Sequence, residues 1–111
     1  MDAESKYIVV LVTVPAREEA ERIARGVLEE KLAACVNIIP GVDSYYWWQG
    51  KIDMSKELLL VIKTQSPLFS QLKERVASLH SYDVPEIIAM PLAQGSPSYL
   101  NWINESVRQP E

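Results

Sequence analysis

The chain contains 111 residues with a formal net charge of -4, a mass of 12.6 kDa and a sequence pI of about 5.0. A chain of this length is expected to fold as one domain, residues 1–111. Nonspecific binding to nucleic acid requires a basic surface that neutralises phosphates. The acidic balance therefore argues against a nucleic-acid partner and against binding to an anionic membrane surface.

The N-terminal sequence has no basic segment ahead of an apolar core, and the apolar run 8–14 is too short to span a bilayer. We therefore expect no targeting or membrane segment and a cytoplasmic location. Cys35 is the single cysteine and cannot form an internal disulfide, so a buried thiol in a reducing compartment fits it. The ends, 1–5 and 108–111, are polar and are expected to be frayed.

In the first part of the chain, β-branched and aromatic runs predict strands, and apolar residues at three- and four-residue steps predict a helix. The strands are expected over 7–14, 33–39, 44–48 and 57–64, and the helix over 16–32. Pro40-Gly41 predicts a bulge or bend within the second strand. Gln49-Gly50 predicts the turn of a hairpin.

In the second part, Ser66 is expected to cap a helix that begins at Pro67 and ends near His80. A connector over 80–86 leads to a short strand over 87–90. Ser96 and Pro97 repeat the capping pattern and begin a terminal helix, whose inner side is formed by Leu100, Ile103 and Val107.

This order of elements is typical of an α+β fold, the ferredoxin-like split βαβ sandwich, with an extra C-terminal helix. Right-handed crossovers place both main helices on one face of an antiparallel sheet and leave the other face bare. Yet the runs Ile8–Val12 and Leu58–Ile62 are apolar on both faces. We therefore predict that the bare face is covered by self-association.

Six segments match a known family in order and spacing. They are Leu11–Pro15, Leu32–Gly41, Tyr46–Ile52, Ile62–Thr64, His80–Ile88 and Gly95–Leu100. Together they resemble the CutA family of divalent-cation tolerance proteins over about residues 7–107, nearly the whole chain.

The resemblance implies a tight homotrimer in which three sheets pack around a central axis and long hairpins reach across to neighbours. It also implies an architecture similar to that of the PII signalling proteins, with clefts between subunits. Family members are described as acting in metal-ion tolerance, some with copper bound, and animal members are associated with anchoring a membrane cholinesterase. No enzymatic reaction is implied.

This chain departs from the family pattern in two places. The family connector usually reads His-Pro-Tyr-Glu, whereas Ser81 replaces the proline and Asp83 the glutamate here. Losing the proline is expected to loosen the loop around His80 and Tyr82. Some members carry a cysteine where this chain has Val12, so one soft metal ligand is missing.

His80 and Glu86 lie on one connector and are the candidate metal ligands. One histidine and one cysteine cannot build a closed soft-ligand site within a subunit, so any copper or other divalent cation would be weakly bound with help from a neighbour. No cofactor is expected to be required. The alternative for His80 is a structural role at the end of a helix.

The aromatic set 45–48 packs on the sheet and across a subunit boundary in one interpretation. In the other, Trp48 or Tyr46 lines an intersubunit cleft together with Tyr82, and Lys63 and Glu57 supply polar groups. The candidate ligand-binding residues are therefore Trp48, Lys63 and Tyr82.

These features favour a non-enzymatic, homotrimeric binding or signalling protein connected with divalent-metal tolerance. The alternatives within that class are a small-molecule-responsive regulator of the PII type and a protein-anchoring scaffold without a physiological metal. An enzyme using Cys35 and His80 is disfavoured because Cys35 lies in a strand rather than at a helix N-terminus. An RNA-binding sheet is disfavoured by the acidic charge and the missing basic-aromatic motif.

Overall fold

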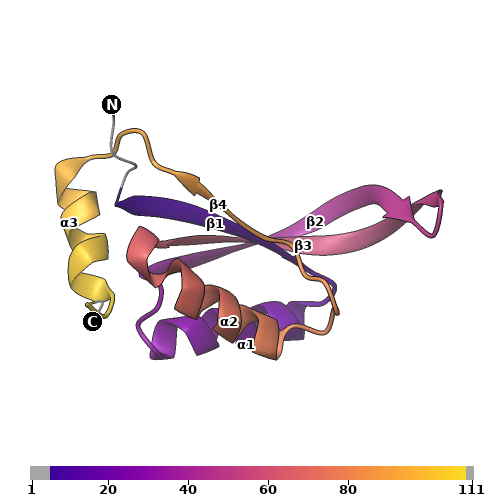
Figure 1. Ribbon diagram of the computed structural model, residues 1–111, viewed down its shortest axis with the longest axis horizontal. Helices are drawn as coiled ribbons and strands as arrows, with labels where there is room; N and C mark the ends of the chain where they lie inside the picture. The colour runs from indigo at the N-terminus through magenta and orange to yellow at the C-terminus, as the bar shows by residue number, and fades with distance from the viewer. Residues whose placement is uncertain (1–5, 110–111) are drawn as a thin grey trace.

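The sheet is built on strand β1 (Tyr7–Val14), whose side chains alternate between buried and partly buried along its whole length in the computed structural model, which describes residues 6–109. The other elements are α1 (Arg17–Glu29), β2 (Cys35–Trp48), β3 (Lys51–Gln65), the 3-10 turn η1 (Ser66–Leu68), α2 (Phe69–Leu79), β4 (Ile87–Pro91) and α3 (Pro97–Ser106). The strand order is β2-β3-β1-β4, and every neighbouring pair is antiparallel. This is the predicted ferredoxin-like sandwich with its additional helix (Figure 1).

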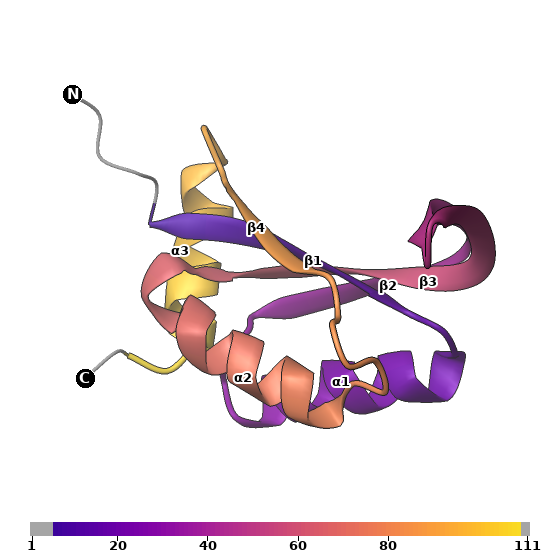
Figure 2. The ribbon, with the colours of Figure 1, turned by 45° about the vertical axis from the view of Figure 1, so that its right-hand side comes forward.

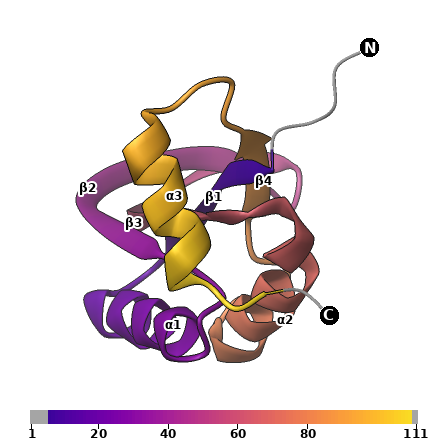
Figure 3. The ribbon, with the colours of Figure 1, turned by 90° about the vertical axis from the view of Figure 1, so that its left-hand side faces the viewer.

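The core lies between one face of the sheet and the helices α1 and α2, which lie side by side (Figure 3). Alternate side chains of β1 and β3, such as Val10 and Ile62, are completely buried there. They pack with apolar residues from the two helices, including Ile23 and Leu72. The two-residue periodicity of the strands and the helical periodicity therefore meet in a single apolar layer.

The opposite side of the sheet, which we call the open face, carries the remaining apolar side chains of the same strands. Val9, Leu11 and Val61 are partly exposed, and Ile39, Ile88 and Met90 are 45%, 50% and 48% exposed. Helix α3 crosses one end of the sheet (Figure 3). There Asn104 accepts a hydrogen bond from Gln65, so that end is covered within the subunit while the rest stays uncovered.

Strands β2 and β3 form a hairpin that reaches far beyond the helices (Figure 1). The pairing runs from Cys35 opposite Lys63 to Trp48 opposite Lys51. The turn is the predicted Gln49-Gly50, and both residues have positive φ, 51° and 80°, as a two-residue hairpin turn requires. Strand β3 begins six residues earlier than expected, since the polar stretch 51–56 pairs with β2 although it lacks an apolar run.

The predicted irregularity at Pro40-Gly41 is confirmed. The register shifts between Ile39 and Val42, so two residues of β2 lie opposite one of β3, and Gly41 has a φ of 78°. Beyond this bulge the hairpin curls (Figure 2).

Two helix ends differ from their predicted positions. Helix α1 ends at Glu29 rather than 32, because Lys31 turns to a φ of 57° and lets Leu32 reach the core from outside the helix. Ser66 does not cap α2 but begins the 3-10 turn that precedes it, whereas the predicted cap at Ser96 is present and accepts a hydrogen bond from the Tyr99 amide.

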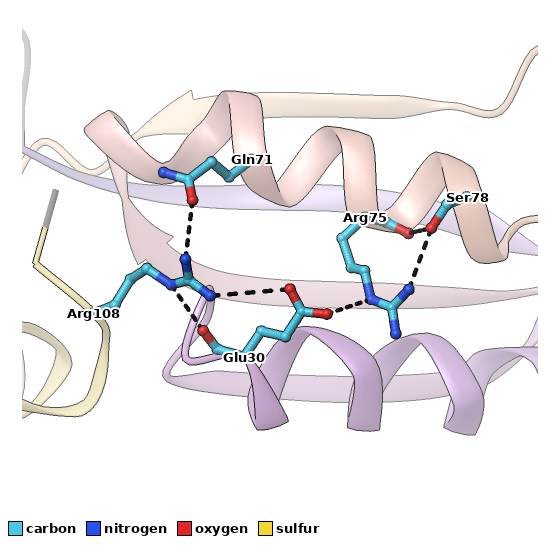
Figure 4. A network of polar contacts seen from close by, with 5 residues as sticks. All are labelled: Glu30, Gln71, Arg75, Ser78 and Arg108. Carbon is cyan, nitrogen blue, oxygen red and sulfur yellow. Dashed lines mark hydrogen bonds and ion pairs between the residues drawn. The ribbon is translucent and has the colours of Figure 1, made fainter. Parts of the chain in front are cut away.

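The C-terminal segment is tied to the helices at Arg108, which differs from the frayed tail expected from that residue onward. Its backbone amide donates to the Lys31 carbonyl at 2.8 Å, and its guanidinium donates to the Glu30 carbonyl and to Gln71. The Glu30 carboxylate also pairs with Arg75 of α2 (Figure 4). The remaining residues expected to be frayed, 1–5 and 110–111, lie outside the described part of the chain.

Candidate functional site

A cavity of about 790 Å³, which we call the hairpin cleft, lies between the curled hairpin and the connector from α2 to β4. Residues of both strands and of the connector line it, among them Tyr46, Trp48, Glu57, Tyr82 and Glu86. The bulge in β2 places Tyr46 and Trp48 on the same side of the hairpin as Glu57 of β3. The hairpin curls beyond the bulge (Figure 2), and side chains of both its strands and of the connector line the cleft.

One hydrogen bond joins the two walls of the hairpin cleft. The Tyr82 hydroxyl donates to Oε2 of Glu57 at 2.7 Å, and Glu57 is only 8% exposed. Burial raises the pKa of the Tyr82 hydroxyl well above its ordinary value of 10.0, and the bond to the Glu57 carboxylate raises it further. Tyr82 is therefore a stable donor that holds the connector against β3 over the physiological pH range.

His80 anchors the base of the connector, and its side chain is completely buried. Nε2 donates to the Thr13 carbonyl at 2.8 Å, since a carbonyl oxygen can only accept. Nδ1 accepts from the Tyr82 amide at 3.1 Å and lies 3.2 Å from Oε2 of Glu19. The same Glu19 oxygen accepts from the Ser81 amide at 2.9 Å. The connector is thus tied to the end of β1 and to the first turn of α1.

Two of the three predicted ligand-binding residues come together. Trp48 and Tyr82 both line the hairpin cleft, as does Glu57. Lys63 lies elsewhere, near the other end of β3, where its ammonium group contacts Asn37 and lies 4.0 Å from the Cys35 sulfur. Lys63 is therefore a residue of the open face rather than of the cleft.

The predicted metal ligands are placed differently from each other. Glu86 lines the hairpin cleft and is exposed, whereas both ring nitrogens of His80 already contact protein groups. Within residues 6–109, no group of three or more His, Cys, Asp or Glu side chains is arranged to hold a metal ion. These contacts of His80 fit the structural role that the sequence left open as an alternative.

Cys35 and His80 are not brought together. Cys35 pairs with Lys63 across the hairpin, while His80 contacts Thr13, whose neighbour on β3 is Leu59. These positions are four residues apart along the strands, which corresponds to roughly 13 Å. A thiol activated by this histidine is therefore not formed within the subunit.

The most important residue that sequence reasoning did not single out is Glu19. It reads as an acidic residue that favours a helix N-terminus, but it is 6% exposed and joins the connector to α1. Its partners lie more than sixty positions away in the sequence. No local pattern signals such a contact.

We expect Glu19→Ala to lower the free energy of unfolding by about 1–3 kcal/mol, since the partly buried Ser81 amide and the buried His80 ring lose their contact with the carboxylate. Glu18→Ala is the matched control, because Glu18 is an exposed acid in the same helical turn. That variant should change stability by less than about 0.5 kcal/mol. Urea unfolding and hydrogen exchange of the Ser81 amide provide the measurements, and equal effects of the two variants would contradict the assignment.

Tyr82 should make stability fall with rising pH. Its pKa is raised in the folded state, so the folded chain keeps a proton that the unfolded chain releases above pH 10.0. This contribution is complete below pH 10.0 and is lost as the pH rises through the folded-state pKa. Urea unfolding at alkaline pH should show a shallower decline for Tyr82→Phe than for the wild type. The decline in Glu57→Gln should be intermediate, because Tyr82 is still buried but no longer bonded to a carboxylate. If Tyr82→Phe declines as steeply with pH as the wild type, Tyr82 does not have this role.

Within the described residues, no helix combines the length and the apolar character needed to cross a bilayer. The cytoplasmic location expected from the sequence is not supported, because relatives of the chain are named for other compartments. A rice relative is named chloroplastic, and a structure from Archaeoglobus fulgidus is described as a periplasmic divalent cation tolerance protein. The shared domain occurs in proteins named for different compartments, so its residues do not decide the location of this chain.

The similarity to these proteins is extensive. The divalent-cation tolerance protein CutA of Thermus thermophilus is 54% identical over 88% of this chain and 95% of its own length. Its solved structure superposes with a TM-score of 0.90 over 92% of this chain and 99% of that one.

The Archaeoglobus structure has a TM-score of 0.89 at 44% identity, covering 92% of this chain and 99% of that one. The rice protein is 51% identical over 92% of this chain, which spans 58% of the rice sequence. The family model described as CutA1 divalent ion tolerance protein matches residues 8–106. The chain belongs to the CutA1 divalent ion tolerance protein family.

Proposed function

We propose that this chain is a non-enzymatic, homotrimeric protein of the binding or signalling type that contributes to divalent-metal tolerance. Membership of the tolerance family supports the general role. The observation that carries the binding role is the hairpin cleft, whose walls are fixed by the contacts of Glu57 and His80. A preformed cavity with apolar walls and a few oriented polar groups is typical of ligand sites.

The assembly is supported by the open face. Apolar side chains on β1–β4 face away from the helices, and among them Ile39, Ile88 and Met90 are about half exposed. A contiguous apolar surface of this kind is uncommon on a monomer and is covered efficiently by symmetric copies. A trimer would bring the extended hairpin of each copy close to its neighbours and make the hairpin cleft an intersubunit cleft.

Of the two alternatives within this class, the cleft favours a regulator that responds to a small molecule, with an architecture similar to that of PII. The aromatic side chains Tyr46, Trp48 and Tyr82 line a cavity large enough for a metabolite. Any copper ion would be a weakly held ligand, bound by Glu86 together with groups from a neighbouring copy.

Sedimentation at low micromolar concentration, on protein purified without added metal, tests the assembly. The wild type should sediment as a trimer. Ile88→Asp should dissociate it, because a carboxylate replaces an apolar contact on the open face. Leu28→Asp is the control, since Leu28 lies on α1 and is 39% exposed. A wild type that sediments as a single 12.6 kDa chain would refute the trimer.

Calorimetric titration with copper tests the metal site. Glu86→Gln should weaken copper binding several-fold, because an amide is a poorer ligand than a carboxylate. Glu105→Gln, an exposed acid on α3, serves as the charge-matched control. If Glu86→Gln and the wild type bind copper equally, Glu86 is not a ligand; elemental analysis of the untreated protein shows whether any metal copurifies.

A further inference from the structure

The charge of the hairpin cleft has one sign. Four acidic residues line it, two from β3 and two from the connector: Asp53, Glu57, Asp83 and Glu86. Among the described residues that line the cleft there is no lysine, arginine or histidine. Phosphate and carboxylate ligands are held by such cations or by helix N-termini. The lining therefore disfavours an anionic ligand, a nucleotide included.

The acids of the cleft are also too widely spaced to form a metal site among themselves. A divalent cation needs several oxygen atoms converging at about 2.0–2.6 Å. No three acidic side chains of the described chain are grouped in this way. They are instead distributed around a cavity of about 790 Å³, which is the size of a small-molecule site rather than of an ion site.

Glu57 gives the cleft a buried carboxylate. It is 8% exposed, and Oε2 of its carboxylate accepts from the Tyr82 hydroxyl at 2.7 Å. A carboxylate that is largely removed from water attracts a nearby positive charge more strongly than an exposed one, because solvent screens it less. A cation entering the hairpin cleft would therefore be drawn to Glu57.

The aromatic side chains of the cleft are held in place by polar contacts at their hydroxyl groups. The Tyr46 hydroxyl lies 2.5 Å from the Ser55 hydroxyl, and the Tyr82 hydroxyl is fixed by Glu57. Trp48 also lines the cleft and is 59% exposed. Aromatic faces beside a carboxylate attract the methyl and methylene groups of an alkylammonium ion, both by cation–π attraction and by apolar contact.

We propose that the hairpin cleft binds a small organic ammonium ion, with its charged nitrogen beside Glu57 and its alkyl groups against Tyr46, Trp48 and Tyr82. This assignment rests on the proposed binding role of the cleft and names the ligand class. It separates the cleft ligand from the divalent metal, so the two would bind at different groups of the same protein.

Choline and its uncharged isostere 3,3-dimethylbutan-1-ol provide the test, because they have the same shape and differ in one atom and one charge. Each is titrated into the full-length native assembly and followed by the NMR signals of the Trp48 indole and the Tyr82 amide. Choline should shift both signals and bind at least about tenfold more tightly than the neutral alcohol. Equal binding of the two, or no shift with choline, would overturn the proposal.

Variants identify the group that recognises the charge. Glu57→Gln should weaken choline binding about tenfold while its amide oxygen still accepts from Tyr82. Asp43→Asn is the control with the same charge change, because Asp43 lies on the same hairpin, pairs with Lys56 at 2.9 Å and does not line the cleft. It should bind choline within about twofold of the wild type.

Sedimentation of the same samples keeps the two proposals distinguishable. Choline binding by a protein that sediments as a monomer would support the ligand class and refute the trimer. Absence of choline binding, combined with dissociation of the trimer by Glu57→Gln, would overturn the ligand assignment, since Glu57 would then pair with a cation of a neighbouring copy.

Discussion

The pairing of β2 with β3 is the constraint on which the rest of the molecule depends. It begins beside the core, where Ile62 is buried under the helices, and continues to Trp48 and Lys51 at the tip of the hairpin. The half near the core is stabilised by burial of aliphatic side chains. The outer half has polar and aromatic side chains and little cover, so the ladder hydrogen bonds and the rigid inner half determine its position. The hairpin cleft lies between this outer half and the connector.

The second wall of the cleft depends on buried polar contacts instead of apolar packing. His80 and Glu19 fix the start of the connector, and Tyr82 then reaches across to Glu57. Each of these groups would be costly to bury without its partner, so the contacts must form together. These contacts give the connector a defined path. The Ser81 amide contributes by donating to Glu19, a hydrogen bond that a proline at this position could not make.

Local sequence signals predicted the features that depend on local physics. The hairpin turn at Gln49-Gly50, the bulge at Pro40-Gly41 and the cap at Ser96 all follow from torsions and hydrogen bonds within a few residues. The aliphatic strands and the ferredoxin-like order followed from periodicity and from the handedness of crossovers.

Features that depend on distant contacts were not predictable in this way. Glu19 reads as an ordinary helix-start acid, and Lys63 reads as a cleft residue until the register of β3 places it beside Cys35. The start of β3 was missed because the segment 51–56 is held by its partner strand and not by its own apolar character. For the candidate site, the sequence identified the aromatic members together with Glu57 and Glu86, while Asp53 and Asp83 were found to line the cleft only in the structure.

The extra residue at Pro40-Gly41 has a consequence for how such a cleft can change. Loss of either residue would remove the bulge but leave Val42 opposite Glu57, Tyr46 opposite Asp53 and Trp48 opposite Lys51, so the same side chains would still share that side of the hairpin. The bulge therefore tunes the bend of the strand without changing which side chains the cleft presents, so the curvature of the hairpin can vary separately from its chemistry.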